Sequence, residues 1–137
     1  MNAIRGGHEL VVNDIRRESA TPHLEAGAQW ADTPRQVAEE SEIVFTSLPG
    51  PREVEAVALG EDGLTEGLTE GKVFLDLSTS SPALIRDIYA KFAERGIHVL
   101  DAPVSGGPEG ARTRKLAVWV GGDEEIFERC KPALDAI

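Results

Sequence analysis

The sequence predicts an α/β fold: a Rossmann-like, mostly parallel sheet with flanking helices. Two observations predict it. Short apolar runs alternate with amphipathic segments along the whole chain, and the apolar runs are nearly continuous. Such alternation is typical of strands joined by crossover helices, and continuous apolar strands indicate burial on both faces of a sheet. With 137 residues, of which 41% are hydrophobic, the chain suffices for one domain with a real core.

The elements expected in the first third of the chain are short. They are, in order, a helix over residues 2–5, a strand over 8–14 (HELVVND), a helix over 19–26, a strand or turn over 27–30 and a helix over 34–40. Gly6-Gly7 is placed to end the first helix, and Thr33 is placed to cap the last one.

Longer elements are expected in the rest of the chain. Strands are predicted over 43–48 (IVFTSL), 72–77 (KVFLDL), 97–100 (IHVL) and 116–120 (LAVWV), and helices over 51–59, 82–95 and 124–136. Ser81 and Asp123 occupy the N-cap positions of the last two helices, and Pro82 stands at the first helical position. Gly96 is placed to end its helix.

Polar or small residues follow four of the predicted strands. These are Asp14, then Ser47-Leu48-Pro49, then Ser78-Thr79-Ser80, then Ser105-Gly106-Gly107. In an open parallel sheet the ligand crevice lies beyond the carboxyl ends of the strands, so these segments are candidates for binding. A carboxylate such as that of Asp14 matches the two hydroxyls of a ribose, although a turn acid that ends a strand is an equal alternative.

The segment Ser105-Gly106-Gly107 places a hydroxyl beside two residues without Cβ atoms. Bare backbone N–H groups in such a loop allow a small anion, for example a carboxylate, to approach closely. A tight turn whose glycines only supply unusual dihedral angles is the alternative. The hydroxyls of Ser78, Thr79 and Ser80 have a plain explanation in helix capping, but Ser81 is expected to fill that role.

Charge and composition exclude several classes of function. The formal net charge of −10 disfavours binding to nucleic acid or to a membrane surface, because phosphates would be repelled. The lone Cys130 shares a helical stripe with Ile126, Phe127 and Leu134, which predicts a buried thiol and fits a reduced, cytoplasmic setting. The three histidines are scattered without a second ligand at a useful spacing, so no metal site is expected.

Four motifs in series identify a resemblance that extends from residue 2 to residue 137. The motifs are LPGPREVEAV, DLSTSSP, LDAPVSGGPEGA and VGGDEE. In this order and at these spacings the chain resembles the N-terminal NAD(P)-binding domain of the β-hydroxyacid dehydrogenases. That group contains 3-hydroxyisobutyrate dehydrogenase, tartronate semialdehyde reductase and, more distantly, 6-phosphogluconate dehydrogenase. One motif alone would be a weak signal, whereas four in order are strong.

The resemblance implies roles for the cofactor-binding residues. Asp14 matches the residue that meets the adenosine ribose, and an acid there is similar to the NAD-preferring members. NADP remains possible, because Arg16 and Arg17 follow closely and a guanidinium can bind a 2′-phosphate. Leu48 and Pro49 match the loop beside the central part of the cofactor.

The resemblance extends these roles to the reacting end of the cofactor and to the substrate. Thr79 matches the hydroxyl residue near the nicotinamide ribose. Ser105, Gly106 and Gly107 match the substrate loop that holds the carboxylate of the hydroxy acid. The implied substrate is therefore a small 3-hydroxy acid.

Two departures from the family pattern bear on activity. The family begins with a strand and a G-x-G-x-x-G turn, so the chain is expected to be N-terminally truncated, with the first strand missing. In the family the catalytic lysine lies beyond the position of Ile137 and is followed by an all-helical C-terminal domain, and both are expected to be absent from residues 1–137. We expect residues 1–137 to be a partial NAD(P)-binding domain, with no catalytic residue and no activity of its own.

The expected function is that of the parent enzyme, which would transfer hydride between a nicotinamide cofactor and a small 3-hydroxy acid. The full-length parent is expected to form a homo-oligomer. One alternative is a non-catalytic module, derived from this fold, that binds a small anion or a protein partner. Another is a relative of the imine reductase type, which shares the domain but differs in the missing half.

Overall fold

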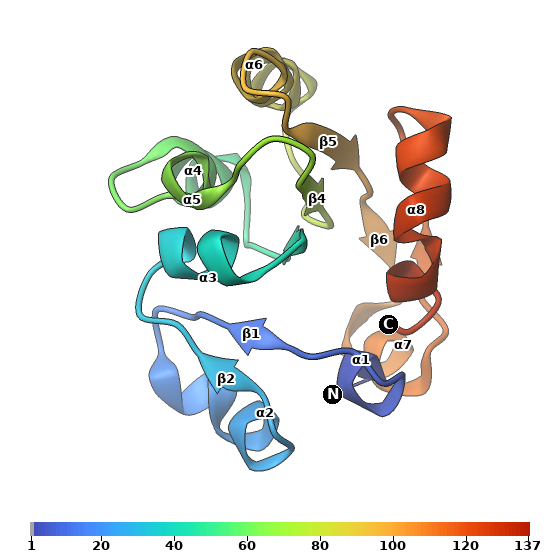
Figure 1. Cartoon of the computed structure of the whole chain (residues 1–137). Coiled ribbons are helices and arrows are strands. Elements are labelled where there is room, and N and C mark those ends of the chain that lie inside the picture. The colour runs from blue at the N-terminus through green and yellow to red at the C-terminus, as the bar shows by residue number, and fades with distance from the viewer. Residues whose placement is uncertain (1) are drawn as a thin grey trace.

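Parallel strands form two separate ladders in the computed structural model, which describes residues 2–137 (Figure 1). β1 (Val11–Val12) pairs with β2 (Gln29–Trp30). β3 (Ile43–Thr46), β4 (Val73–Asp76) and β5 (His98–Asp101) form the larger ladder, in the order β3-β4-β5. The predicted class, an α/β fold with parallel strands and flanking helices, is confirmed.

Helices flank both ladders. They are α1 (Asn2–Arg5), the 3-10 helix η1 (Arg17–Ala20), α2 (Thr21–Glu25), α3 (Pro34–Glu40), α4 (Pro51–Leu59), α5 (Leu64–Gly67), α6 (Pro82–Ala93), α7 (Gly107–Thr113) and α8 (Glu124–Leu134). Within residues 2–137, none of these helices combines the length and the apolar character needed to cross a lipid bilayer.

Side-chain capping explains where two of these helices begin. Thr33 Oγ1 accepts a hydrogen bond of 3.1 Å from the backbone N–H of Gln36, which confirms the predicted cap of α3. Asp123 Oδ1 accepts from the N–H groups of Glu125 and Ile126 at 2.9 and 3.1 Å, which confirms the cap of α8. Each bond satisfies a donor that the first helical turn leaves free.

The prediction that the Ser81 hydroxyl caps α6 is wrong. Ser81 stands at the N-cap position, but its side chain makes no capping hydrogen bond. The helix begins at Pro82, whose fixed φ suits the first turn and whose missing N–H needs no partner. The start of α6 is therefore set by proline rather than by a hydroxyl.

Two predicted strands are much shorter than their apolar runs. The strand expected over residues 8–14 contains only Val11 and Val12, because its partner β2 supplies only two residues. The run 116–120 contributes only β7 (Ala117–Val118), which pairs antiparallel with β6 (Val104–Ser105), a strand that was not predicted. An apolar run shows that a segment is extended, but the length of the ladder depends on the partner strand.

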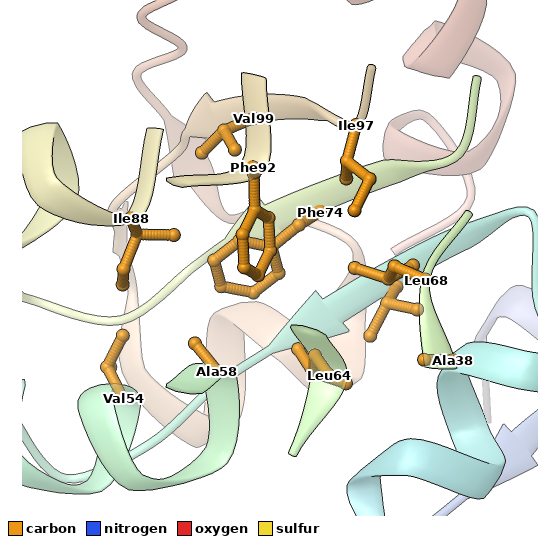
Figure 2. Close-up of a cluster of buried hydrophobic side chains, with 11 residues drawn as sticks. Ala38, Val54, Ala58, Leu64, Leu68, Phe74, Ile88, Phe92, Ile97 and Val99 are labelled. Carbon is orange, nitrogen blue, oxygen red and sulfur yellow. The ribbon is translucent and has the colours of Figure 1, made fainter. Parts of the chain in front are cut away.

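One hydrophobic cluster fills the face of the β3-β4-β5 ladder that α4 and α6 cover (Figure 2). Phe74 of β4 and Phe92 of α6 meet edge to face at its centre, with ring centroids 5.7 Å apart and an angle of 61° between the planes. Other fully buried members come from α3, α4, α5 and α6 and from the residue that follows α5; they are Ala38, Val54, Ala58, Leu64, Ile88 and Leu68.

A second cluster lies between the opposite face of the ladder and α8. Cys130 is fully buried there beside Val73, Leu75 and Leu100, which confirms the predicted core thiol. Burial raises the pKa of the Cys130 thiol, and the charge of Arg129 opposes this shift in part. The thiol is therefore protonated and shielded in the native fold.

We expect Cys130 to resist thiol reagents in the native protein. The reactive species is the thiolate, and both burial and the raised pKa suppress it. Ellman's reagent should modify less than one tenth of the thiol in an hour without denaturant, and all of it within minutes in ~6 M guanidinium chloride. Rapid stoichiometric labelling of the native chain would contradict the placement of α8.

The N-terminal helix packs against elements from the other end of the chain. Asn2 Nδ2 donates to the carbonyl oxygen of Ala111 at 2.7 Å, and the Arg114 guanidinium donates to the Asn2 carbonyl at 3.2 Å. Figure 1 shows α1 beside α7 and the end of α8. These contacts fix α1 on the side that carries β6 and β7.

Candidate functional site

A row of polar side chains crosses the carboxyl edge of the β3-β4-β5 ladder. Thr46, Asp76 and Asp101 are the last residues of the three strands and are paired in register. Register partners in a parallel sheet point their side chains to the same face, so the three form one row. Thr46 Oγ1 donates to Asp76 Oδ1 at 2.8 Å, which joins two members of the row directly.

Asp76 links this row to the loops beyond the strands. The side chain is fully buried, and its Oδ1 also accepts from the backbone N–H of Ser78 at 3.0 Å. Ser78 Oγ in turn accepts from the backbone N–H of Leu48 at 2.9 Å. Asp76 Oδ2 is buried without a hydrogen-bond partner in the described chain. The loop after β3 and the loop after β4 are thus tied together through Asp76 and Ser78.

Three of the predicted cofactor contacts lie on these two loops. Leu48 is half-buried and packs against the larger cluster, whereas Pro49 next to it is exposed. Thr79 is exposed directly after the buried Ser78. The structure therefore brings together the loops that carry Leu48, Pro49 and Thr79.

The fourth predicted cofactor contact lies on the smaller ladder. Asp14 follows β1, beyond its carboxyl end, and its side chain is exposed. Its Oδ1 accepts from the backbone N–H of Arg16 at 2.8 Å, as in an Asx turn. Asp14 thus has the local bond expected of a turn acid, and it is also accessible to a ligand.

Arg17, one of the two arginines that could bind the 2′-phosphate of NADP, contacts Trp30 and Asp32. Its guanidinium lies over the ring of Trp30, 4.9 Å from the centroid, and 3.9 Å from the carboxylate of Asp32. The indole N–H of Trp30 donates to the same carboxylate at 2.7 Å. The three side chains form a small charged and aromatic cluster beside the end of β1.

The predicted substrate loop spans the end of β6 and the start of α7. Ser105 is exposed at the end of β6, and Gly106 and Gly107 have φ values of +132° and +57°. A Cβ on Gly106 would lie 3.2 Å from Leu116 Cδ2, whereas one on Gly107 would meet nothing within 4 Å. A side chain at Gly106 is disfavoured by the positive φ and by the short distance to Leu116, whereas the surroundings of Gly107 are open.

The whole chain matches a known domain family. Residues 1–137 match the model of the NAD binding domain of 6-phosphogluconate dehydrogenase. The chain belongs to this family. The fold and the resemblance expected from the four sequence motifs are therefore confirmed, and the cofactor class of this NAD-binding domain is a nicotinamide dinucleotide.

Relatives place the 6-phosphogluconate dehydrogenase-type domain among oxidoreductases. The chain is 42% identical over 137 residues to the 2-hydroxy-3-oxopropionate reductase of Escherichia coli (strain K12), covering 100% of this chain and 47% of that protein. It is 28% identical to the crystal structure of 3-hydroxyisobutyrate dehydrogenase from Salmonella typhimurium, with a TM-score of 0.91, covering 99% of this chain and 47% of that one.

A third relative is a complex with a dinucleotide. The structure of Psf3 with NADP+ and 2-OPP is 29% identical, with a TM-score of 0.92, and the match covers 98% of this chain and 48% of that one. The chain spans less than half the length of the relatives that it matches. It corresponds to the NAD-binding domain of hydroxyacid dehydrogenases of the 3-hydroxyisobutyrate type.

Asp101 differs electrostatically from the exposed acids of this 6-phosphogluconate dehydrogenase-type domain. Partial burial raises the pKa of its carboxyl above the usual value, and the nearby charge of Asp76 raises it further. The ionised form of Asp101 is thus disfavoured by folding.

We expect Asp101→Asn to stabilise the domain at neutral pH. A carboxyl whose pKa is raised by folding favours the native state below its unfolded pKa of ~3.9 and loses that contribution as pH rises through the folded value. The Tm of the variant should exceed that of the wild type at pH 7 by a few degrees, and the difference should vanish near pH 3. A variant that is equally or less stable at pH 7 would contradict the raised pKa of Asp101.

Asp76, the residue that connects the two loops, is not among the site residues predicted from the sequence. One signal was present: Asp76 is the single acid within the apolar run KVFLDL. An ionisable group in a strand buried on both faces needs bonded partners, and those partners define a network. The inference that Ser78 has no capping role holds, because its hydroxyl bonds to Leu48 in another loop.

Proposed function

We propose that this domain holds the dinucleotide of an enzyme that transfers hydride between a nicotinamide cofactor and a small 3-hydroxy acid. The observation that carries the proposal is the Ser78–Leu48 hydrogen bond of 2.9 Å, which joins two loops at the carboxyl edge of a parallel sheet. Dinucleotides bind at this edge in open α/β sheets. The family match supports the cofactor class.

The side chains beyond the carboxyl ends of the two parallel ladders suit an extended dinucleotide. We assign Asp14 to the adenosine ribose, because its exposed carboxylate can accept from a hydroxyl while Oδ1 keeps its bond to Arg16. Leu48 and Pro49 would line the central part of the cofactor, and the exposed hydroxyl of Thr79 would meet the nicotinamide ribose. The chemistry of these groups fits a dinucleotide.

We assign Ser105, Gly106 and Gly107 to the carboxylate of the substrate. Ser105 offers an exposed hydroxyl, and the open surroundings of Gly107 leave its backbone accessible to an anion. Binding and orientation are what these residues supply. The bound nicotinamide would supply the hydride chemistry itself.

We propose that NAD is preferred to NADP. The carboxylate of Asp14 would repel a 2′-phosphate, and the guanidinium of Arg17 is already engaged by Asp32 and by the ring of Trp30. An arginine that bound the 2′-phosphate would have to leave both partners. Arg16 is exposed and remains the route by which NADP could still bind.

We further propose that residues 1–137 alone bind dinucleotide weakly and do not turn over substrate. They contain no G-x-G-x-x-G turn and no lysine at the position of the family's proton-transfer residue. For the whole protein we propose a homo-oligomer in the cytoplasm, a setting in which the single Cys130 stays reduced.

Isothermal titration with NAD, NADH, NADP and NADPH tests the proposal, together with hydride-transfer assays on 3-hydroxyisobutyrate and tartronate semialdehyde. We expect weak binding of NAD and NADH, weaker binding of the phosphorylated forms, and no turnover. Asp14→Ala should weaken NAD binding about tenfold, a loss of ~1.4 kcal/mol, and Glu9→Ala serves as an exposed control.

Two outcomes contradict the proposal. Turnover by this chain at an ordinary enzymatic rate of roughly 1–10³ s⁻¹ would overturn the assignment of the chemistry to residues outside it. Binding of small carboxylates such as 3-hydroxyisobutyrate without any binding of dinucleotide would instead favour a non-catalytic anion-binding module.

A further inference from the structure

We propose that Asp76 is a positioning residue that acts through Ser78 to hold the loop of Leu48 against the loop of Thr79, and so sets the shape of the site for the nicotinamide end of the cofactor. This inference rests on the proposed function for its final step. The clamp itself rests only on hydrogen bonds and burial within the fold.

A buried carboxylate costs stability unless it is well bonded. Asp76 is fully buried, and its Oδ2 has no hydrogen-bond partner in the described chain. An apolar side chain of similar size at such a position is often as good for stability or better. The carboxylate therefore contributes geometry rather than packing, and that contribution comes from the bonds of Oδ1.

The bonds of Asp76 Oδ1 lead through Ser78 to the loop of Leu48. Oδ1 accepts from Thr46 Oγ1 at 2.8 Å and from the N–H of Ser78 at 3.0 Å, which fixes the start of the loop after β4. The hydroxyl of Ser78 then accepts from the N–H of Leu48 at 2.9 Å. Two loops that are 30 residues apart in sequence are thereby held by one short chain of bonds, of which the two to Asp76 are buried and the one to Leu48 is partly buried.

Two exposed residues lie next to the clamp. Pro49 follows Leu48, and Thr79 follows Ser78, so the two exposed residues each lie one position beyond a bonded residue. Loss of the Ser78–Leu48 bond would allow both loops to move next to the exposed residues Pro49 and Thr79. The separation of Pro49 and Thr79 determines whether the cofactor can contact both residues at once.

The chain offers a matched control for the central residue. Ser80 is two positions from Ser78 and carries the same hydroxyl, which is also buried, but that hydroxyl has no partner within residues 2–137. Ser78→Ala removes the acceptor of the Leu48 N–H, whereas Ser80→Ala removes a hydroxyl that ties no loop. Comparison of the two separates the clamp from a general effect of losing a hydroxyl in this loop.

Asp76 is tested by a conservative and a disruptive substitution. Asp76→Asn retains an oxygen that can accept from Thr46 and Ser78, and it places an amide N–H₂ in the position of the unpartnered Oδ2. Asp76→Ala removes both bonds. We expect the asparagine to keep the clamp and the alanine to lose it.

The experiment measures amide hydrogen exchange of the ¹⁵N-labelled 137-residue chain, followed by titration with millimolar NAD monitored at the Thr79 amide. In Ser78→Ala and Asp76→Ala we expect the Leu48 amide to exchange about tenfold faster and NAD to bind about tenfold more weakly. In Ser80→Ala and Asp76→Asn both values should stay within about twofold of the wild type. Exchange in the β4 core reports whether each variant is folded.

The outcomes separate this inference from the proposed function. Unchanged exchange at Leu48 in a folded Ser78→Ala variant would overturn the clamp, even if NAD binds. Faster exchange with unaltered NAD affinity would overturn the positioning role. Faster exchange in a chain whose wild type shows no saturable response to NAD would support the clamp and overturn the proposed function instead.

Discussion

Phe92→Ala is expected to lower the free energy of unfolding by about 3–5 kcal/mol. Phe92 is fully buried and meets the ring of Phe74 edge to face at 5.7 Å, so alanine would leave a cavity at the centre of the larger cluster. Such a loss is a large share of the ~5–15 kcal/mol that stabilises a typical domain. Helix α6 is attached to the sheet mainly through this cluster.

Urea denaturation followed by circular dichroism measures the effect, with Tyr89→Ala as the matched control. Tyr89 is an aromatic residue on the same helix but is 56% exposed, so its removal should change stability by no more than about 0.5 kcal/mol. Phe92→Leu should recover part of the loss. Equal effects at the exposed and buried positions would show that α6 does not pack as described.

Gly67→Ala is expected to lower the free energy of unfolding by about 1–3 kcal/mol, because the added methyl group would overlap backbone atoms of α3. A Cβ at Gly67 would collide with the carbonyl oxygen of Arg35 and would lie 2.9 Å from the Cβ of Ala38. Both atoms belong to α3, whose helix lies directly against α5. The two helices would have to separate, and α3 carries Ala38 into the larger cluster.

Gly121→Ala provides the control for this second variant. A Cβ at Gly121 would meet only the carbonyl oxygen of Asp101, at an ordinary 3.8 Å. Because alanine lowers the entropy of the unfolded chain, this variant should be neutral or more stable by roughly 0.4–1 kcal/mol. Thermal melts of both variants decide the matter: a stable Gly67→Ala protein would contradict the close packing of α3 on α5.

The strongly periodic parts of the fold could be predicted from sequence. Helix α6 begins at the predicted Pro82, and the apolar runs of β3, β4 and β5 are strands at nearly the predicted positions. Apolar periodicity indicates which residues are buried, and the burial of one face determines where such helices and strands form. Helices α5 and α7 were not predicted, because they are short and glycine-rich and are set by tertiary packing: Gly67 against α3, and Gly110 against Leu116.

The location of the candidate site could be predicted from the strand ends, but the hydrogen bonds that connect its loops could not. The position of Leu48 and Thr79 after neighbouring strands follows from the order of apolar runs, and the structure confirms that their loops are joined. The role of Asp76 could not be predicted, since its partner Thr46 is 30 residues away and the pairing depends on strand register. The assigned ligand roles of all the predicted site residues remain predictions; these residues are Asp14, Leu48, Pro49, Thr79, Ser105, Gly106 and Gly107.

A crystal structure of residues 1–137 grown with millimolar NAD would show where on this domain the dinucleotide binds. We expect a dinucleotide along the carboxyl ends of the parallel strands, with the adenosine ribose at Asp14 and the nicotinamide ribose at Thr79. A dinucleotide bound elsewhere, for example in the groove between β7 and α8 that Val118 and Phe127 line, would contradict it.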